Sequence, residues 1–259
     1  MKKIIILIPV YNDWESLVKL INQINDNLHE YDFLKIECII INDASTTKEP
    51  KFIKPTKIDS LKIMNMKENK GHARCNAFGI RYIYQNEEFD YLILMDGDGE
   101  DRPIELKSFI NRILIESDKS VVAKRVKRSE GFIFKFLYFM HKLITLIFTG
   151  KKINFGNYSC LTKKDVEKIF SKASLWSSYS GTVKRYIKNF GEIRSSRGLR
   201  YFGPSKMSLF NLIIHSFSII AVFKNQVLLR TSLSILMLIY LNFTFGINLI
   251  FFKLILLIF

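Results

Sequence analysis

Two aspartates separated by one glycine are the residues of this chain best suited to metal chemistry. Asp96 and Asp98 come directly after the apolar run 91–95. Two carboxylates one residue apart at the end of a strand can point at one divalent cation, and such hard oxygen ligands suit Mg²⁺ or Mn²⁺. Gly97 and Gly99 remove side chains that would block a bulky anionic ligand. The spacing therefore predicts a metal site whose ion is shared with substrate phosphates.

The surrounding segments indicate which fold positions this pair. An Asp-x-Asp alone is weak evidence, because acidic residues are common in turns after strands. In the first half of the chain, however, apolar segments alternate with segments of helical periodicity. This pattern is typical of an α/β fold with a mainly parallel, helix-covered sheet. The expected strands are 3–9, 36–43, 61–66 and 91–95, and the expected helices are 15–28 and 73–85.

Several polar residues are expected to gather at one edge of this sheet. Ligands of open parallel sheets bind beyond the carboxyl ends of the strands. The residues at or just after those ends are Pro9, Tyr11 and Asp13, then Asp43, then Asp96 and Asp98. Asp13 also precedes a predicted helix and can serve as its N-cap at the same time.

The last third of the chain holds a long apolar segment. From Leu228 to Phe259 the only charges are Arg230 and Lys253. This length exceeds the roughly 20 apolar residues that cross a bilayer. We expect one transmembrane span, or two short spans that turn near residues 242–248.

Two shorter apolar segments precede it. Residues 205–223 are expected to form an interfacial helix, whereas 131–150 fits a buried helix and an interfacial one equally well. The expected organisation is therefore an α/β domain over 1–204, an interfacial helix over 205–227 and a transmembrane segment over 228–259.

The net charge of the 259-residue chain is +15. Nucleic-acid binding is one explanation, but no recognised nucleic-acid motif accompanies the charge. A domain that lies against anionic lipid and handles anionic substrates accounts for the same charge, and we favour that explanation. Basic residues precede the predicted span, which places the N-terminal domain in the cytoplasm. The cysteines show no metal or disulfide spacing, as in a reducing compartment. We expect a membrane-anchored protein with membrane lipids, and no nucleic acid, among its partners.

Four motifs occur in a definite order along the chain. They are IPVYND (8–13), IIINDAS (39–45), NKGHARCNAFG (69–79) and MDGDGEDRP (95–103). Together they resemble the family 2 glycosyltransferases of the GT-A type, which implies a Rossmann-like, mixed and mainly parallel sheet with flanking helices. The basic segment RGLRYFGPSK (197–206) before the apolar helices is similar to the polyprenyl-phosphate sugar transferases, the dolichyl-phosphate mannose synthase kind.

The resemblance assigns roles on the donor side. It implies a nucleotide sugar held by Pro9, Tyr11, Asp13, Asp43, Gly71, Arg74 and Asp96, with Asp96 and Asp98 on Mg²⁺ or Mn²⁺ and Glu100 lining the sugar pocket or contacting the metal. Arg74 fits a solvated helix residue as well as a phosphate contact. The family usually shows Asp-Asp-Gly-Ser where this chain has Asn42-Asp43-Ala44-Ser45. The transfer is expected to invert the anomeric carbon.

The acceptor is expected to be a polyprenyl phosphate. Transfer to a hydroxyl normally needs a carboxylate base, yet residues 174–191 contain no acid, and Asp165 and Glu167 are expected on an exposed helix face. A phosphate monoester is already anionic and needs cations instead, for which Arg125, Arg197, Arg200 and Lys206 are the candidates.

Two other functions remain open from the sequence. Relatives that use phosphate acceptors usually carry Phe-Arg where this chain has Tyr158-Ser159. A sugar hydroxyl of a lipid-linked or surface-polysaccharide intermediate is therefore the rival acceptor. A membrane-anchored module that binds without turnover is the other alternative, and the intact Asp43, Asp96 and Asp98 argue against it.

Overall fold

A computed structural model describes residues 1–52, 55–127, 132–203 and 209–245. The chain divides into two compact units. The sheet unit comprises Met1–Ser129 and Asn154–Met207, and the helical unit comprises Glu130–Ile153 and Ser208–Phe259. Residues 130–153, which the sequence prediction placed within 1–204, thus group with the helical unit because their apolar helix packs against other apolar helices.

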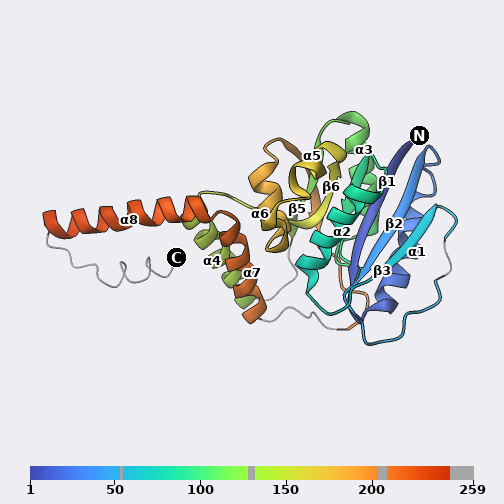
Figure 1. Ribbon diagram of the computed structural model, residues 1–259, viewed down its shortest axis with the longest axis horizontal. Coiled ribbons are helices and arrows are strands. Elements are labelled where there is room, and N and C mark those ends of the chain that lie inside the picture. Colours follow the sequence, from blue (N-terminus) through green and yellow to red (C-terminus); the bar gives the residue numbers. More distant parts are fainter. Residues whose placement is uncertain (53–54, 128–131, 204–208, 246–259) are drawn as a thin grey trace. The chain divides into compact units, whose positions relative to one another are not determined.

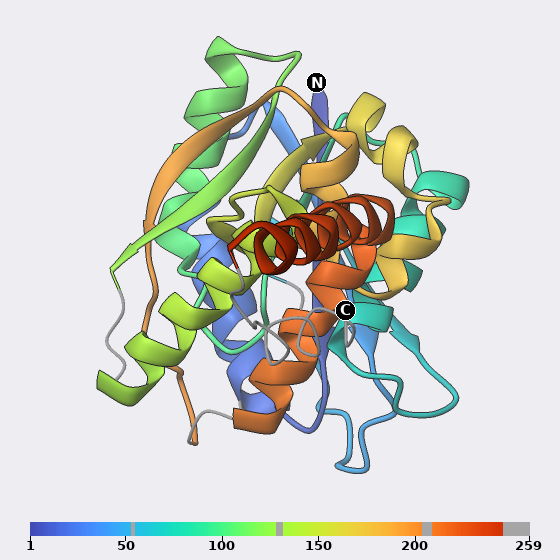
Figure 2. The same ribbon diagram turned by 90° about the vertical axis from the view of Figure 1, so that its left-hand side faces the viewer.

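The sheet unit is built on one seven-stranded sheet in the order β3-β2-β1-β4-β6-β5-β7. β1 pairs in parallel with both β2 and β4, and β2 pairs in parallel with β3, as the alternating pattern predicts. β6 runs antiparallel to β4 and β5, and β5 and β7 run side by side in parallel (Figure 2). The strands are β1 (Lys2–Val10), β2 (Leu34–Asn42), β3 (Ser60–Asn65), β4 (Tyr91–Leu94), β5 (Ser120–Lys127), β6 (Phe155–Thr162) and β7 (Phe190–Ser196).

Helices cover both faces of this sheet (Figure 1). The helical elements are α1 (Trp14–Leu28), α2 (His72–Asn86), η1 (Pro103–Glu105), α3 (Leu106–Ile115), α5 (Lys163–Ile169), η2 (Ala173–Trp176) and α6 (Tyr179–Tyr186). Alternate β1 residues such as Ile4 and Ile6 join one core with residues of α1 and α3. On the other face α2 packs closely on β1, because a Cβ at Gly79 would lie only 2.5 Å from Leu7 Cδ1.

The strand register brings three loops to one edge of the sheet. Val10 at the end of β1 pairs with Asn42 at the end of β2, and Leu7 pairs with Leu94 at the end of β4. The loops that follow β1 and β2 are joined, because Asn12 N–H donates to Ser45 Oγ at 2.9 Å. Ala44 takes a left-handed φ of 55°, the conformation that glycine adopts without strain. The alanine that replaces the family's glycine therefore keeps the backbone conformation that favours glycine.

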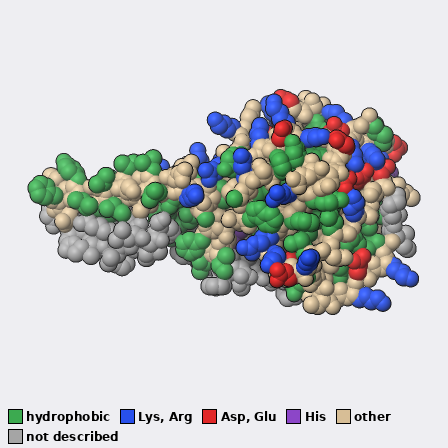
Figure 3. Space-filling view, in the orientation of Figure 1, with side chains coloured by type: hydrophobic (Ala, Val, Ile, Leu, Met, Phe, Trp, Pro, Cys, Tyr) green, Lys and Arg blue, Asp and Glu red, His purple; other side chains and the backbone are tan. Residues whose placement is uncertain are grey.

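The helical unit consists of α4 (Phe132–Thr149), α7 (Leu209–Val222) and α8 (Lys224–Phe245). Phe148, Ile219, Phe223 and Val227 form its buried cluster. Most of α8 stays outside that cluster: Leu236 is 61% exposed and Phe243 is 90% exposed. Figure 3 shows hydrophobic side chains along this helix.

Helix α8 matches the predicted apolar segment in part. Its residues Lys224–Thr244 are long and apolar enough to cross a membrane, by length and composition. The helix begins before Leu228 and ends at Phe245, inside the region 242–248 where the alternative of two short spans places a turn. Residues 246–259 lie outside the described part of the chain.

Candidate active site

The acidic loop, residues 96–101, follows β4 at the edge where the strand ends meet. Asp96 is held from three sides. Its N–H donates to Asp101 Oδ2 at 3.0 Å, and its Oδ1 lies 2.9 Å from His72 Nε2 and 3.4 Å from Asn157 Nδ2. His72 is the first residue of α2 and Asn157 lies near the start of β6, so two neighbouring elements aim polar groups at one carboxylate.

Asp101, at the end of the acidic loop, connects back to its start through the Asp96 N–H. Its side chain is buried, and Arg125 Nη2 lies 3.7 Å from its Oδ1. Burial and the nearby Asp96 charge raise the pKa of Asp101 to about 8, against the opposing effect of Arg125. The structure thus places Arg125, a predicted acceptor cation, against a loop carboxylate, and the acceptor role remains a proposal.

Asp98 is engaged through both of its oxygens. Its Oδ1 accepts the Glu100 N–H at 3.0 Å, and its Oδ2 lies 2.8 Å from Arg200 Nη1. Burial and the Asp96 charge raise the pKa of Asp98 to about 6. For Asp96, burial opposes ionisation, but His72 and Arg125 hold the pKa of that carboxyl below its ordinary value. The pKa of Asp98 is therefore raised and the pKa of Asp96 is lowered, although the two carboxyl groups belong to one motif.

The crossing segment, residues 197–202, follows β7 and lies over the acidic loop. Arg197 pairs with Glu100, and Arg200 pairs with Asp13 as well as with Asp98. Two predicted acceptor cations therefore contact the donor-side carboxylates in this structure. The fourth, Lys206, lies outside the described residues.

The predicted donor-side residues come from β1, from α2 and from the loops at the strand ends. Buried Asp43 accepts the N–H groups of Lys70 and Gly71 at 2.7 and 2.9 Å, so it fixes the loop that precedes α2. Gly71 has a φ of +86°, which favours glycine. Pro9 is buried in β1, whereas Tyr11 is exposed. Arg74 is exposed and donates to Lys70 O at 3.3 Å.

Residues 174–191, which contain no acid, include most of η2 and all of α6. Ser178 caps α6 by accepting the Gly181 N–H at 3.2 Å. Tyr158 is buried and donates its hydroxyl to Arg102 O at 2.9 Å. Tyr158, which stands where phosphate-acceptor relatives usually carry Phe, therefore uses its hydroxyl to hold the loop after the acidic motif.

The expectation for Asp165 was wrong, whereas Glu167 is exposed as predicted. Asp165 is 5% exposed, and its Oδ2 accepts from Ser120 Oγ at 2.5 Å. Asp165 lies on the buried face of α5, where Ser120 provides a hydrogen-bond donor. Thr162, just before α5, pairs with Tyr91 at the start of β4, so Asp165 lies at the edge opposite the acidic loop.

Sequence reasoning missed His72, Asn157 and Asp101 as site residues. His72 belongs to the NKGH motif and begins a helix at the sheet edge, and that position was the available signal. Asn157 could not be found, because the strand β6 that carries it was not predicted.

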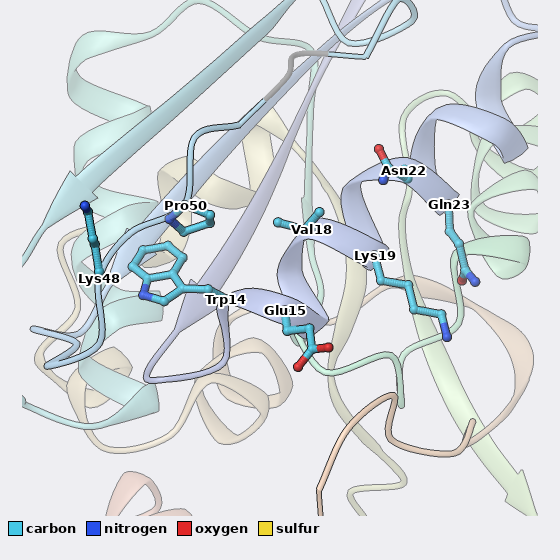
Figure 4. A pocket seen from close by; sticks show the side chains of 8 residues that line it. All are labelled: Trp14, Glu15, Val18, Lys19, Asn22, Gln23, Lys48 and Pro50. Carbon is cyan, nitrogen blue, oxygen red and sulfur yellow. The ribbon is translucent and has the colours of Figure 1, made fainter.

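A pocket of about 540 Å³ lies along α1 and the loop after β2 (Figure 4). It is lined by Trp14, Glu15, Val18, Lys19, Asn22, Gln23, Lys48 and Pro50. None of these is a predicted site residue. Two of its lining residues, Lys19 and Gln23, contact Tyr201 of the crossing segment.

The donor set fits a hard divalent cation. Among the described residues, no group of three or more His, Cys, Asp or Glu could hold a metal ion by itself. Asp96 and Asp98 would supply carboxylate oxygens and leave the other positions to phosphate and water, as Mg²⁺ sites usually do. The guanidinium of Arg200 already lies against Asp98, which shows that a cation is accommodated at this carboxylate.

The mixed, mainly parallel sheet, with the loops after β1 and β2 joined at the strand ends, is the GT-A-like fold expected from the motifs. A model of the glycosyl transferase family 2 matches residues 5–178. The chain belongs to this family, which confirms the resemblance read from its motifs.

Two curated relatives share 24% identity with parts of the chain. A match over 113 residues, 42% of this chain, covers 46% of an uncharacterized protein of Methanocaldococcus jannaschii. The chain thus spans about half the length of that relative. A match over 188 residues, 67% of this chain, covers 71% of a UDP-N-acetylglucosamine–dolichyl-phosphate N-acetylglucosaminyltransferase of Methanococcus voltae.

Among solved structures, the chain is similar in fold to glucosyl-3-phosphoglycerate synthase from Mycobacterium tuberculosis. The TM-score is 0.55 at 12% identity, over 87% of this chain and 80% of that one. That enzyme was crystallised with Mn²⁺, UDP-glucose and phosphoglyceric acid. At this identity the likeness shows the fold alone.

Proposed function

We propose that the protein transfers a hexose from a nucleotide sugar to a polyprenyl phosphate, with inversion and with a divalent metal, at the cytoplasmic face of a membrane. The observation that supports a phosphate acceptor is the lack of any Asp or Glu in residues 174–191, around α6. The Methanococcus voltae relative, named for a dolichyl-phosphate acceptor, supports the same choice.

The donor would bind across the three joined loops. Asp43 holds the loop before α2 on the side proposed for the base, with Pro9, Tyr11, Asp13, Gly71 and Arg74 as the other donor-binding residues. Asp96 and Asp98 would hold Mg²⁺ or Mn²⁺, which supplies positive charge beside the leaving diphosphate. His72, Asn157 and Asp101 keep Asp96 in place for this role.

The acceptor phosphate needs no proton removed before it reacts. One of its oxygens attacks the anomeric carbon, the bond from that carbon to the diphosphate oxygen breaks, and the electron pair leaves with the diphosphate. Arg197, Arg200, Arg125 and Lys206 are the proposed cations for the acceptor, and Glu100 would line the sugar pocket. Charge-assisted hydrogen bonds from guanidinium groups suit a phosphate at this position.

A membrane location follows from the same proposal. A polyprenyl phosphate keeps its chain in the bilayer, and α8 is long and apolar enough to cross one. Basic residues before the apolar helices favour a cytoplasmic catalytic domain.

A matched pair of acceptors tests the acceptor class. The purified full-length protein is given a panel of nucleotide sugars with Mg²⁺ or Mn²⁺, and either a polyprenyl phosphate or the polyprenol of the same chain length. Mass spectrometry should find a hexose on the phosphate alone. Transfer to the polyprenol, or only to the hydroxyl of a lipid-linked sugar, would replace the proposal with its rival.

A further inference from the structure

The crossing segment is shaped to lie on the acidic loop. Gly198 N–H donates to Glu100 O at 2.8 Å, and Tyr201 N–H donates to Asp98 O at 2.9 Å. A Cβ at Gly198 would lie 2.7 Å from Gly99 O, and a Cβ at Gly99, whose φ is +88°, would lie 2.5 Å from the Tyr201 ring. Both glycines are therefore required for this close approach of two backbones.

Charge pairing holds the segment down. Arg200 lies between Asp98, after β4, and Asp13, after β1, and its side chain is 13% exposed. Arg197 pairs with Glu100 in the same loop. Because these side chains are largely removed from solvent, their charges are screened less than those of surface ion pairs.

The guanidinium of Arg200 stands where the metal's charge is proposed to act. Asp98 Oδ1 is engaged by the Glu100 N–H and Oδ2 by Arg200. A divalent ion on Asp98 would have a second cation beside it, and the two would repel each other. The ion and Arg200 therefore cannot both keep their full interaction with this carboxylate.

A second attachment lies outside the charged cluster. The Tyr201 hydroxyl pairs with Gln23 on α1, and Lys19 Nζ lies 4.8 Å from the centre of the Tyr201 ring. Leu199 is 81% exposed. The segment thus has a side attachment to α1 that does not depend on Asp98.

We propose that the crossing segment is an autoinhibitory strap, in which Arg200 neutralises Asp98 until the metal and the donor diphosphate together displace it. The inference rests on the metal-dependent donor site proposed above. The diphosphate offers Arg200 a new anionic partner, so the metal alone binds weakly while the metal with diphosphate binds well. The strap then opens only when the donor is present.

Mn²⁺ binding measured by electron paramagnetic resonance tests this competition. Without nucleotide, Arg200→Ala should bind Mn²⁺ about tenfold more tightly than wild type, a coupling typical of competing ligands. Arg194→Ala, which removes an exposed charge of β7 nearby, should bind like wild type. Unchanged or weaker Mn²⁺ binding by Arg200→Ala would overturn the strap.

A spin label reports the strap directly. The native cysteines Cys38, Cys75 and Cys160 are buried, so a nitroxide can be placed selectively on Leu199→Cys. The label should be less mobile without ligands than with Mg²⁺ and UDP, and should show the higher mobility without ligands when Arg200→Ala is added. A label equally mobile in all three states rejects the strap even if Mn²⁺ binds.

The Mn²⁺-binding and spin-label experiments together distinguish a failure of the strap from a failure of the proposed donor site. If Mn²⁺ fails to bind to any variant with UDP present, the metal-dependent donor site is wrong, and the strap as a competitor with metal is wrong with it. If Mn²⁺ binds with UDP but Arg200→Ala changes neither affinity nor label mobility, the donor site stands and only the strap is rejected.

Discussion

At the residue scale, the site depends on carboxylates whose surroundings differ. The side chain of Asp96 contacts His72 and Asn157, and its N–H donates to Asp101. Asp98 instead contacts Arg200, which is displaced in the proposal. The two aspartates on either side of Gly97 therefore have different roles in the proposal: Asp96 is held in place, and Asp98 exchanges Arg200 for the metal.

Replacing Asp98 by asparagine separates its charge from its shape. The amide side chain would keep an acceptor for the Glu100 N–H but lose the charge proposed to hold the metal. We expect Asp98→Asn to lose about 100-fold or more in kcat, since electrostatic groups at reacting centres contribute on that order. Initial rates with Mn²⁺ check this, and Asp118→Asn, at an exposed turn, is the control. Retained activity in a folded Asp98→Asn would remove Asp98 from the metal site.

The sequence predicted the residues that follow strands but not their partners. Asp43, Asp96 and Asp98 were found because polar residues after apolar strands gather at one sheet edge. The pairing of Asp13 with Arg200 spans 187 positions and depends on where β7 ends, which no local pattern reveals. The buried position of Asp165 on α5 was missed for the same reason, because its partner Ser120 lies 45 positions away, at the start of β5.

At the element scale, the close packing of α2 on β1 positions both His72 and the strand ends. Gly79 makes this approach possible, since a Cβ there would meet Leu7 Cδ1 at 2.5 Å and Ile41 Cγ1 at 3.2 Å. The early strands and helices were predicted within a few residues, because each carries a clear apolar pattern. β5, β6 and β7 were not predicted. β5 carries Arg125, β6 carries Asn157, and β7 leads into the crossing segment.

A larger side chain at Gly79 should push α2 away from the sheet. We expect Gly79→Val to lower the free energy of unfolding of the sheet unit by about 1–3 kcal/mol, as overpacked cores do. Thermal unfolding in detergent checks the change, with Arg81→Val, at an exposed position of the same helix, as control. Equal stability of the two variants would show that the α2–β1 contact gives way without penalty.

At the scale of the whole molecule, the chain combines a family 2 glycosyltransferase fold with apolar helices. The segment 228–259 was predicted from its composition, and α8 confirms an apolar helix over its first part. The grouping of 130–153 with the helical unit was not predicted, because a periodic apolar helix does not reveal which neighbours bury it.

Membrane attachment should withstand conditions that remove peripheral proteins. If α8 crosses the bilayer, the protein stays in the membrane fraction after alkaline carbonate, since the apolar surface holds it independently of charge. Immunoblotting of the pellet and supernatant checks this, and a high-salt wash is the control for purely electrostatic binding. Release by carbonate would show a peripheral protein and remove the proposed span.

The linkage in the lipid product tests the central claim most directly. Membranes containing the active protein are supplied with a radiolabelled nucleotide sugar and polyprenyl phosphate, and the extracted lipid is treated with mild acid. The account predicts that the labelled hexose is released quantitatively by mild acid, as expected of a sugar joined to a lipid monophosphate, and that Asp98→Asn yields no such lipid. A labelled lipid whose sugar resists mild acid, because it is joined to another sugar's hydroxyl, would contradict it.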